Sequence, residues 1–340
     1  MVRLSLDLAE WSLEHRVFLR AVHLCDRSLY SAGADLDCAL DFYLGSWLPQ
    51  VKSSTSVETW IQPPIDVAWI WHVHKLSPIQ YSKDCMQWFG KLVDVPPGIS
   101  PFSFSPRYSD RMCSKINLTS IQADTSEFRS KITASAAHQA SLLWHLRWPE
   151  YDDVQFLEES VDRYLKMVAL KRLSPQLFVV PLYDIDYVWH THMAFPGNYT
   201  SLCKDLLGRR LNHDDSDSDR STGGRLHASF DATSELWRQT YGSDYSKEGA
   251  MYRGEPPDWF ASDRVTAAGA GFPRGSLHCA AAIAGCAIGS DEATPPAPSQ
   301  PSRSPDPVLL RGRAAPPRFF QPVISSTCIM YSVVFRSLAR

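Results

Sequence analysis

One stretch of the sequence occurs twice, and this repetition limits the fold more than any other feature of the chain. The copies span residues 63–90 and 181–208, and an offset of 118 residues aligns them without a gap. Self-similarity at a fixed period is the signature of an internal duplication, so we expect two similar structural units. The identical pairs include Asp66 and Asp184, Trp71 and Trp189, His72 and His190, His74 and His192, Pro78 and Pro196, Tyr81 and Tyr199, Cys85 and Cys203, and Gly90 and Gly208.

Apolar residues around the first copy recur at helical spacing. Residues 5–22 and 33–48 predict two amphipathic helices, the first capped by its initial serine and the second ended by Pro49. Within the copy, Pro64 opens a third helix in its first turn, and this helix carries the Trp-His-x-His motif. We expect Ser77 to cap a fourth helix, which begins with a proline and ends at a glycine.

The second half of the chain repeats this arrangement. Residues 126–145 and 154–170 are predicted helices, and the second copy adds two more. Residues 229–242 predict a further helix, because large aromatic residues recur there about one or two turns apart. The predicted fold class is therefore all-α, with two similar four-helix halves from an internal duplication.

The composition changes at about residue 261. Ten of the 24 prolines lie in residues 261–340, which are rich in alanine and arginine, so we expect a disordered C-terminal tail. The predicted domains are a duplicated helical domain, residues 1–260, and this tail; the domain divides into a first half, 1–90, a connector, 91–125, and a second half, 126–260.

Charge and cysteine usage indicate a compartment and exclude some partners. The net charge of −3 gives no overall attraction to nucleic acid or to an anionic membrane. Asp7 and Glu10 interrupt the N-terminal apolar run, so we expect no signal peptide, and no apolar run reaches the ~20 residues that span a bilayer. None of the eight cysteines forms a C-x-x-C pair. We expect an intracellular protein, cytoplasmic or nuclear.

The paired histidines suggest metal chemistry, since imidazole is a common ligand of divalent transition metals. The candidate ligands are His72, His74, His190, His192, Asp66 and Asp184. Residues i and i+2 point about 200° apart on a helix, so one motif does not present both rings to one ion. A site would instead take one histidine from each half, together with carboxylates.

A structural role is the interpretation that we favour for these residues. Trp71 and Trp189 would anchor the core, and the histidines would hydrogen-bond to neighbouring groups, because buried polar atoms need partners. The remaining repeated residues would complete this structural motif, with the prolines starting helices and the cysteines packing as small buried hydrophobes; these are Pro78, Pro196, Tyr81, Tyr199, Cys85 and Cys203. Under this interpretation the chain needs no cofactor.

Several motifs together carry a family resemblance. The repeated motif, the segments LNHDDSDSDR and EGAMYRG behind it, and the N-terminal pattern LSLDLAEW…FLRAV…LY…WLP resemble the plant glycine-rich domain-containing proteins over roughly residues 3–259. Members of that family continue into a β-rich region and a glycine-rich tail. The last 80 residues of this chain resemble neither, so we expect a truncated form without the usual C-terminal region.

The resemblance implies an intracellular protein connected with development and with abiotic-stress or hormone responses. It brings no established catalytic residues, and the sequence lacks the P-loop, dinucleotide-binding, nucleophile-elbow and H-E-x-x-H patterns. We therefore predict a non-enzymatic regulatory or interaction protein whose partners are other proteins, with no membrane, no DNA and at most weak RNA binding. A metal-binding protein or metalloenzyme that uses the paired histidines is the alternative.

Overall fold

The regular structure of the described residues is helical. The computed structural model describes residues 4–110, 124–214, 219, 221–257 and 260, all of which belong to one unit spanning residues 2–287. These residues contain no strand, only an isolated bridge between Pro64 and Ser105. The predicted all-α class is confirmed, whereas the predicted C-terminal tail lies outside the described residues.

The helices follow one another closely along the chain. Short 3₁₀ turns at Gln139–Ser141 and Pro149–Asp152 flank α8. The α-helices are α1 (Leu8–Leu24), α2 (Ala34–Phe42), α3 (Leu48–Val51), α4 (Ile65–Lys75), α5 (Pro78–Phe89), α7 (Ser126–His138), α8 (Leu142–Leu146), α9 (Val154–Leu173), α10 (Tyr183–Met193), α11 (Pro196–Leu207) and α12 (Arg225–Tyr241).

Two predicted helix ends are wrong. Asp7, not Ser5, caps α1, because its Oδ1 accepts a hydrogen bond from the Glu10 backbone N–H at 3.1 Å. The second predicted helix does not stop at Pro49: α2 runs into a π-helical turn, η1 (Tyr43–Trp47), and then into α3. Pro49 lies in the first turn of α3, where its missing N–H removes no helical hydrogen bond.

Each repeated stretch folds as two helices joined by a tight turn, α4–α5 and α10–α11. Ser77 takes the predicted N-cap position of α5, with Pro78 in the first turn, but its side chain makes no capping hydrogen bond. Phe195 holds the equivalent position before α11 without any hydroxyl, and a proline follows in both copies. The proline, pre-set for a helical first turn, therefore starts these helices without help from a side-chain cap. Gly90 and Gly208 end α5 and α11 with φ of 71° and 70°.

A buried hydrogen-bond chain locks each of these helix pairs. In the first, Trp71 Nε1 donates to Tyr81 Oη at 2.9 Å, and Tyr81 Oη donates to the Val93 carbonyl at 2.8 Å. The second has the same two contacts at 3.0 and 2.8 Å, through Trp189, Tyr199 and Leu211. An internal duplication would produce such matched contacts, and we retain it as a prediction.

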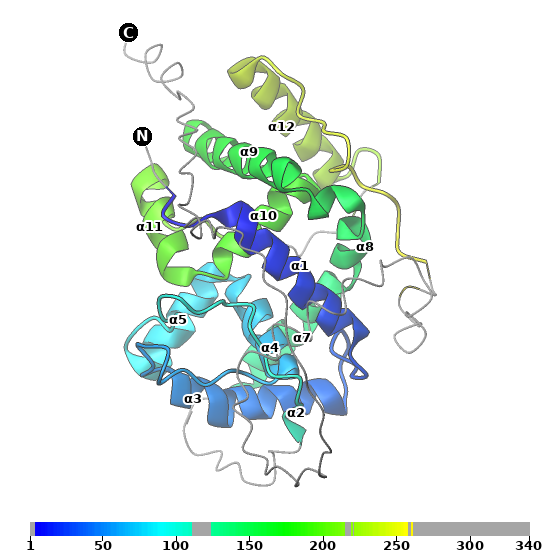
Figure 1. Ribbon diagram of the computed structural model, residues 1–340. Helices are drawn as coiled ribbons and strands as arrows, with labels where there is room; N and C mark the ends of the chain where they lie inside the picture. Colours follow the sequence, from blue (N-terminus) through cyan, green and yellow to red (C-terminus); the bar gives the residue numbers. More distant parts are fainter. Residues whose placement is uncertain (1–3, 111–123, 215–218, 220, 258–259, 261–340) are drawn as a thin grey trace, which may run out of the picture. The chain divides into compact units, whose positions relative to one another are not determined.

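The first helix of each predicted half packs on the other half (Figure 1). Helix α1 lies against α9 and α10, and α7 lies against α4. Leu8 in α1 accordingly belongs to the buried cluster of α9–α11, whereas Phe18 further along α1 belongs to the cluster around α4. At the C-terminal ends of α4 and α10, Lys75 Nζ donates to the Ala194 carbonyl at 3.1 Å. Residues of the two predicted halves thus share the same hydrophobic clusters.

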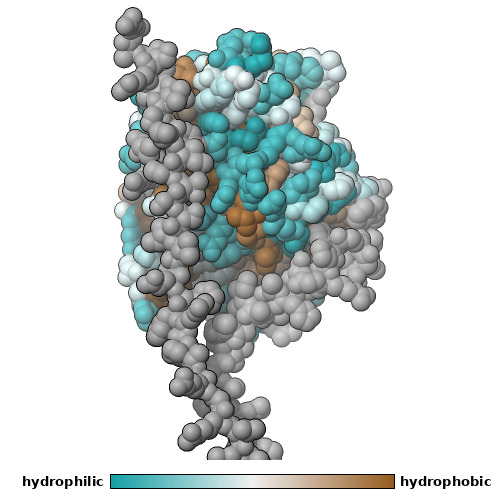
Figure 2. Space-filling view, turned by 45° about the horizontal axis from the view of Figure 1, so that its top comes forward, coloured by the Kyte–Doolittle hydropathy of each residue, from teal (hydrophilic) through white to brown (hydrophobic). Residues whose placement is uncertain are grey.

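Helix α12 corresponds to the further predicted helix and begins four residues earlier than expected. It packs along α9: the Tyr241 hydroxyl donates to the Lys166 carbonyl at 2.8 Å, and the Arg163 guanidinium lies 5.1 Å from the Trp237 ring centroid. The face shown in Figure 2 is mostly hydrophilic, with a small hydrophobic area near its centre. No helix in the described part of the chain is long and apolar enough to cross a membrane.

Candidate functional site

Among the predicted ligands, His74 is held by two internal hydrogen bonds. Its Nδ1 lies 2.8 Å from the Tyr43 hydroxyl, and its Nε2 lies 3.0 Å from Asp84 Oδ2. These two hydrogen bonds make the ring a bridge between η1 and α5. Burial lowers the pKa of His74, and the neighbouring Asp84 opposes that shift.

His192 is held in the same way in the second copy. Its Nδ1 lies 2.9 Å from the Tyr164 hydroxyl, and its Nε2 lies 2.8 Å from Asn198 Oδ1. Burial lowers the pKa of His192 to about 4, which keeps the ring neutral near neutral pH. Both nitrogens of each second histidine therefore have protein partners, as the structural interpretation of the sequence expects.

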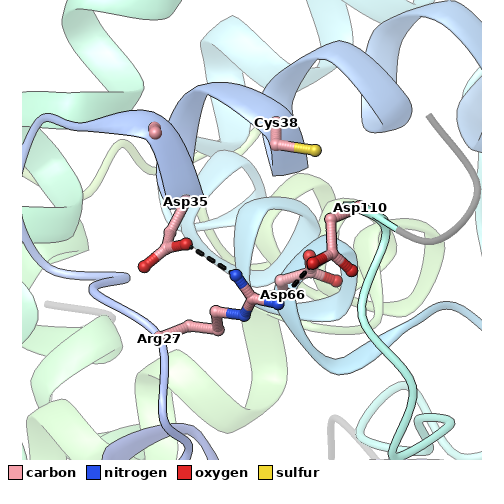
Figure 3. A pocket seen from close by; sticks show the side chains of 6 residues that line it. Arg27, Asp35, Cys38, Asp66 and Asp110 are labelled. Atoms are coloured by element: carbon pink, nitrogen blue, oxygen red, sulfur yellow. Dashed lines mark hydrogen bonds and ion pairs between the residues drawn. The ribbon is translucent and has the colours of Figure 1, made fainter. Parts of the chain in front are cut away.

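The two predicted carboxylates also have partners of their own. Asp66 Oδ2 accepts hydrogen bonds from the Ser109 hydroxyl at 2.5 Å and its N–H at 3.0 Å, and burial raises the pKa of Asp66. Asp66 lines a small pocket of about 250 Å³, in which Arg27 pairs with Asp35 and Asp110 (Figure 3). The positive charge in this pocket is thus the guanidinium of Arg27, a group of the protein itself.

Asp184 is fully buried on α10 and forms an ion pair with α9. Its Oδ2 lies 2.7 Å from Arg163 Nε. A buried carboxylate needs such a counter-charge. Asp184 therefore joins two helices of the second half, and its charge is matched within the fold.

His72 occupies an aromatic interior. Its ring centroid lies 4.8 Å from that of His15, 5.5 Å from Phe18 and 5.8 Å from Trp69. Neither ring nitrogen of His72 has a hydrogen-bond partner among the described residues. Burial, and then the charge of His15, lower the pKa of His72 well below its usual value, so the ring is neutral.

His190 alone among the predicted ligands lies in a group with metal-binding chemistry. His190 Nε2 is 3.0 Å from His213 Nε2 and 3.6 Å from Asp186 Oδ1, and His213 Nε2 is 3.4 Å from the same oxygen. Among the described residues, these are the only three whose potential ligand atoms all lie within 4.8 Å of one another. The six predicted residues thus lie in separate environments, and a site built from that whole set stays a prediction.

Two elements bring this group together. Asp186 and His190 are four residues apart on α10, so their side chains lie on one face of the helix. His213 follows α11, in a segment held by the hydrogen bond from Tyr199 to the Leu211 carbonyl. The His213 ring also packs edge-on against Trp189, with centroids 5.0 Å apart. The repeated Trp–Tyr pair therefore positions the third side chain.

The first copy has no counterpart of this group, although His72 aligns with His190. With the same offset of 118 residues, Ala68 stands in place of Asp186 and Val95 in place of His213. Sequence reasoning from identical pairs missed both residues because they differ between the copies. The signal available was the Asp-x-x-x-His spacing of residues 186–190, which places a carboxylate and an imidazole on one helical face.

The distances in the group match three corners of a tetrahedral metal centre. A zinc ion with ligand bonds of about 2.0–2.1 Å separates its tetrahedral ligands by about 3.3–3.4 Å. The three observed separations, 3.0, 3.4 and 3.6 Å, bracket that value. Two imidazoles and one carboxylate are also a donor set that first-row divalent metals accept. Asp186, His190 and His213 are therefore the described residues best placed to hold a metal.

The group lies in the wall of an open pocket of about 860 Å³. Helices α7 and α8, the segment before α10 and the segments on either side of α12 all contribute to the pocket. His145 stacks on Tyr183 there, with ring centroids 3.9 Å apart. The side chains of His190 and His213 are only 2% and 6% exposed, whereas Asp186 is 20% exposed, so access is from the Asp186 side.

The described residues form an all-α protein in which a histidine–aspartate group lies at the second repeated stretch and the segment that follows it. The family profile described as "Glycine-rich domain-containing protein-like" matches residues 100–205. Glycine-rich domain-containing proteins 1 and 2 of Arabidopsis thaliana are each 32% identical to this chain, over 282 and 280 residues, or 75% of it. The chain belongs to the glycine-rich domain-containing protein family.

The two alignments cover 34% and 35% of these relatives, so the chain spans about a third of their length. No solved structure matches the chain. The family predicted from the repeated motif is thus confirmed.

Proposed function

We propose that this chain is a transition-metal-binding protein, and that Asp186, His190 and His213 hold a zinc ion or a similar divalent metal. The observation that carries this proposal is the convergence of one carboxylate oxygen and two Nε2 atoms at 3.0 to 3.6 Å. In the absence of a metal, the two Nε2 atoms share one proton in a hydrogen bond. With a metal, both Nε2 lone pairs would be needed as ligands, so the one shared proton would move to Nδ1 of its own ring and each neutral imidazole would carry its proton on Nδ1.

We further propose that the metal serves regulation rather than turnover. Support comes from the family, whose resemblance brings no established catalytic residues and implies roles in plant development and in stress or hormone responses. The chain would act inside the cell and would contact other proteins. A metal-dependent stabilisation of the second half suits such a role, because a ligand that binds only the folded state stabilises it by about 2.7 kcal/mol at a hundredfold excess over Kd.

Metal content tests the proposal directly. The full chain is purified without a histidine tag, dialysed with zinc and then freed of excess metal, and its metal is measured by mass spectrometry. We expect about one equivalent of zinc in the wild type, and less than about a tenth in His213→Gln and Asp186→Asn. His227→Gln is the matched control, because His227 lines the same pocket but pairs with Asp231 instead.

Thermal unfolding separates loss of metal from loss of fold. The ligand variants should melt at the temperature of the chelator-treated wild type, and chelator should leave their melting unchanged. Wild-type protein that carries less than a tenth of an equivalent of each of zinc, iron, cobalt, nickel, copper and manganese would overturn the proposal. Equal metal content in wild type and His213→Gln would do the same.

A further inference from the structure

We propose that the metal's fourth position faces the pocket and takes the carboxylate of a small organic acid with an apolar body. This inference rests on the proposed metal site and adds the class of ligand that the site binds. Three described residues supply donors at three corners of a tetrahedron. Three protein ligands that leave one corner for an exogenous group are typical of zinc sites that bind small molecules.

The direction of the fourth corner follows from burial. Asp186, His190 and His213 all line the open pocket, and of the three only the Asp186 side chain is appreciably exposed. The two imidazoles close the inner side of the centre. The remaining corner therefore points past Asp186 into the pocket, where a ligand of moderate size has room.

The charges in the pocket favour an anionic head. A divalent ion bound to one carboxylate and two neutral imidazoles keeps a net charge of about +1. Lys171 and Arg209 line the same pocket, and burial together with the nearby Arg209 lowers the pKa of Lys171. Two cations held near each other are repelled, and a bound anion relieves that repulsion.

Two acidic groups also line the pocket, Asp214 and Glu255. The Glu255 carboxylate accepts a hydrogen bond from the Tyr252 hydroxyl, which satisfies part of its charge. Asp214 immediately follows the ligand His213 and does not belong to the three-residue group. With the metal in place, the positive groups outnumber the negative ones.

The walls favour an apolar body behind the head. Hydrophobic side chains from four parts of the fold line the pocket; they include Met167, Val179, Leu182, Trp189 and Phe230. A volume of about 860 Å³ lies within the range of roughly 300–1,000 Å³ that small-molecule sites occupy. An apolar lining with a few convergent polar groups is the usual design of such sites. An aromatic or aliphatic carboxylic acid matches both features of the pocket: its carboxylate matches the positive charges, and its apolar body matches the hydrophobic walls.

Cobalt-substituted full-length protein gives a direct readout, because the visible spectrum of Co²⁺ reports a change of ligand. The probe is 3-phenylpropanoate, compared with acetate, which lacks the apolar body, and with phenyl phosphate, which carries a different anion. We expect a saturable spectral change with 3-phenylpropanoate, at concentrations at least about tenfold lower than acetate requires, since several apolar groups become buried.

Variants test the two cations. Lys171→Gln and Arg209→Gln should each weaken 3-phenylpropanoate binding about tenfold, because each removes a charge-assisted contact. Lys204→Gln is the control: Lys204 is an exposed residue of α11 that does not line the pocket, and its removal should change nothing.

The outcomes separate the two proposals. Cobalt binding without any spectral response to 3-phenylpropanoate would overturn the ligand assignment and leave the metal site intact. If phenyl phosphate bound more tightly than 3-phenylpropanoate, the preferred anionic group would be a phosphate, and the assignment of a carboxylate would be overturned. No cobalt binding at all would remove both the metal site and its ligand.

Discussion

Removal of one buried hydroxyl from each repeated stretch should destabilise the protein strongly, and by similar amounts. Tyr81→Phe deletes the oxygen that accepts from Trp71 Nε1 at 2.9 Å and donates to the Val93 carbonyl at 2.8 Å. Trp71 and Val93 are 1% and 2% exposed, so water does not replace the lost partner. Each orphaned buried polar group costs about 1–3 kcal/mol, and the substitution leaves two, so the total cost is about 2–6 kcal/mol.

Tyr199→Phe removes the matching pair of contacts, to Trp189 at 3.0 Å and to Leu211 at 2.8 Å. Its expected loss is therefore also about 2–6 kcal/mol. At about 2–4 °C per kcal/mol for a folded unit of this size, the corresponding fall in Tm is about 4–24 °C. The measurement is urea and thermal unfolding followed by far-ultraviolet circular dichroism on the full chain, with both variants at the same protein concentration.

Tyr252→Phe is the control, because Tyr252 is 38% exposed and its hydroxyl donates to the exposed Glu255 and not to a buried group. Its effect should stay within about 0.5 kcal/mol, as for most surface substitutions. Losses below about 1 kcal/mol for both buried tyrosines would refute the argument that these hydroxyls lock the helix pairs. A large loss at one position alone would show that the two copies are not energetically equivalent.

Two further substitutions probe buried charges. Asp184→Asn leaves Arg163 without its fully buried partner at 2.7 Å, so the free energy of unfolding should fall by about 3–5 kcal/mol in denaturant titrations; a fall under about 1 kcal/mol would contradict the buried-pair argument. Burial lowers the pKa of Lys75 to about 7, against 10.5 for a free lysine. Above pH 7 the unfolded chain therefore binds more protons here than the folded chain, and the free energy of unfolding should rise from pH 7 to 8.5. Lys75→Met should flatten that rise, and an identical slope in both proteins would show that Lys75 keeps its charge when folded.

Much of the fold could be predicted from local pattern. Apolar residues at helical spacing predicted the all-α class and most of the helices, and the repeated Pro and Gly residues marked the start and end of α5 and α11. Local pattern failed where local rules compete. Ser77 has the right chemistry for a cap but forms no capping bond, and Pro49 is compatible with a new first turn rather than a stop.

Only one residue of the candidate site, His190, was predicted from the sequence. His190 stood out because it belongs to an identical pair, but the residues that complete its group are those that differ between the copies, Asp186 and His213. The identical residues have structural partners instead: His74 bonds to Tyr43 and Asp84, and the matching His192 has equivalent contacts. Repetition therefore marked the shared scaffold, and divergence within the repeat marked the candidate site.

The sequence by itself determined the all-α class and most of the helices, because these depend on spacing within about thirty residues, and its motifs over residues 3–259 indicated the family. Only the tertiary structure decided which histidine meets which ligand. His213 reaches His190 because the chain turns back after α11 and Tyr199 holds the Leu211 carbonyl, which brings the two Nε2 atoms to 3.0 Å. A segment outside the helices has no periodicity from which its direction follows, so a contact of this kind depends on packing and not on pattern.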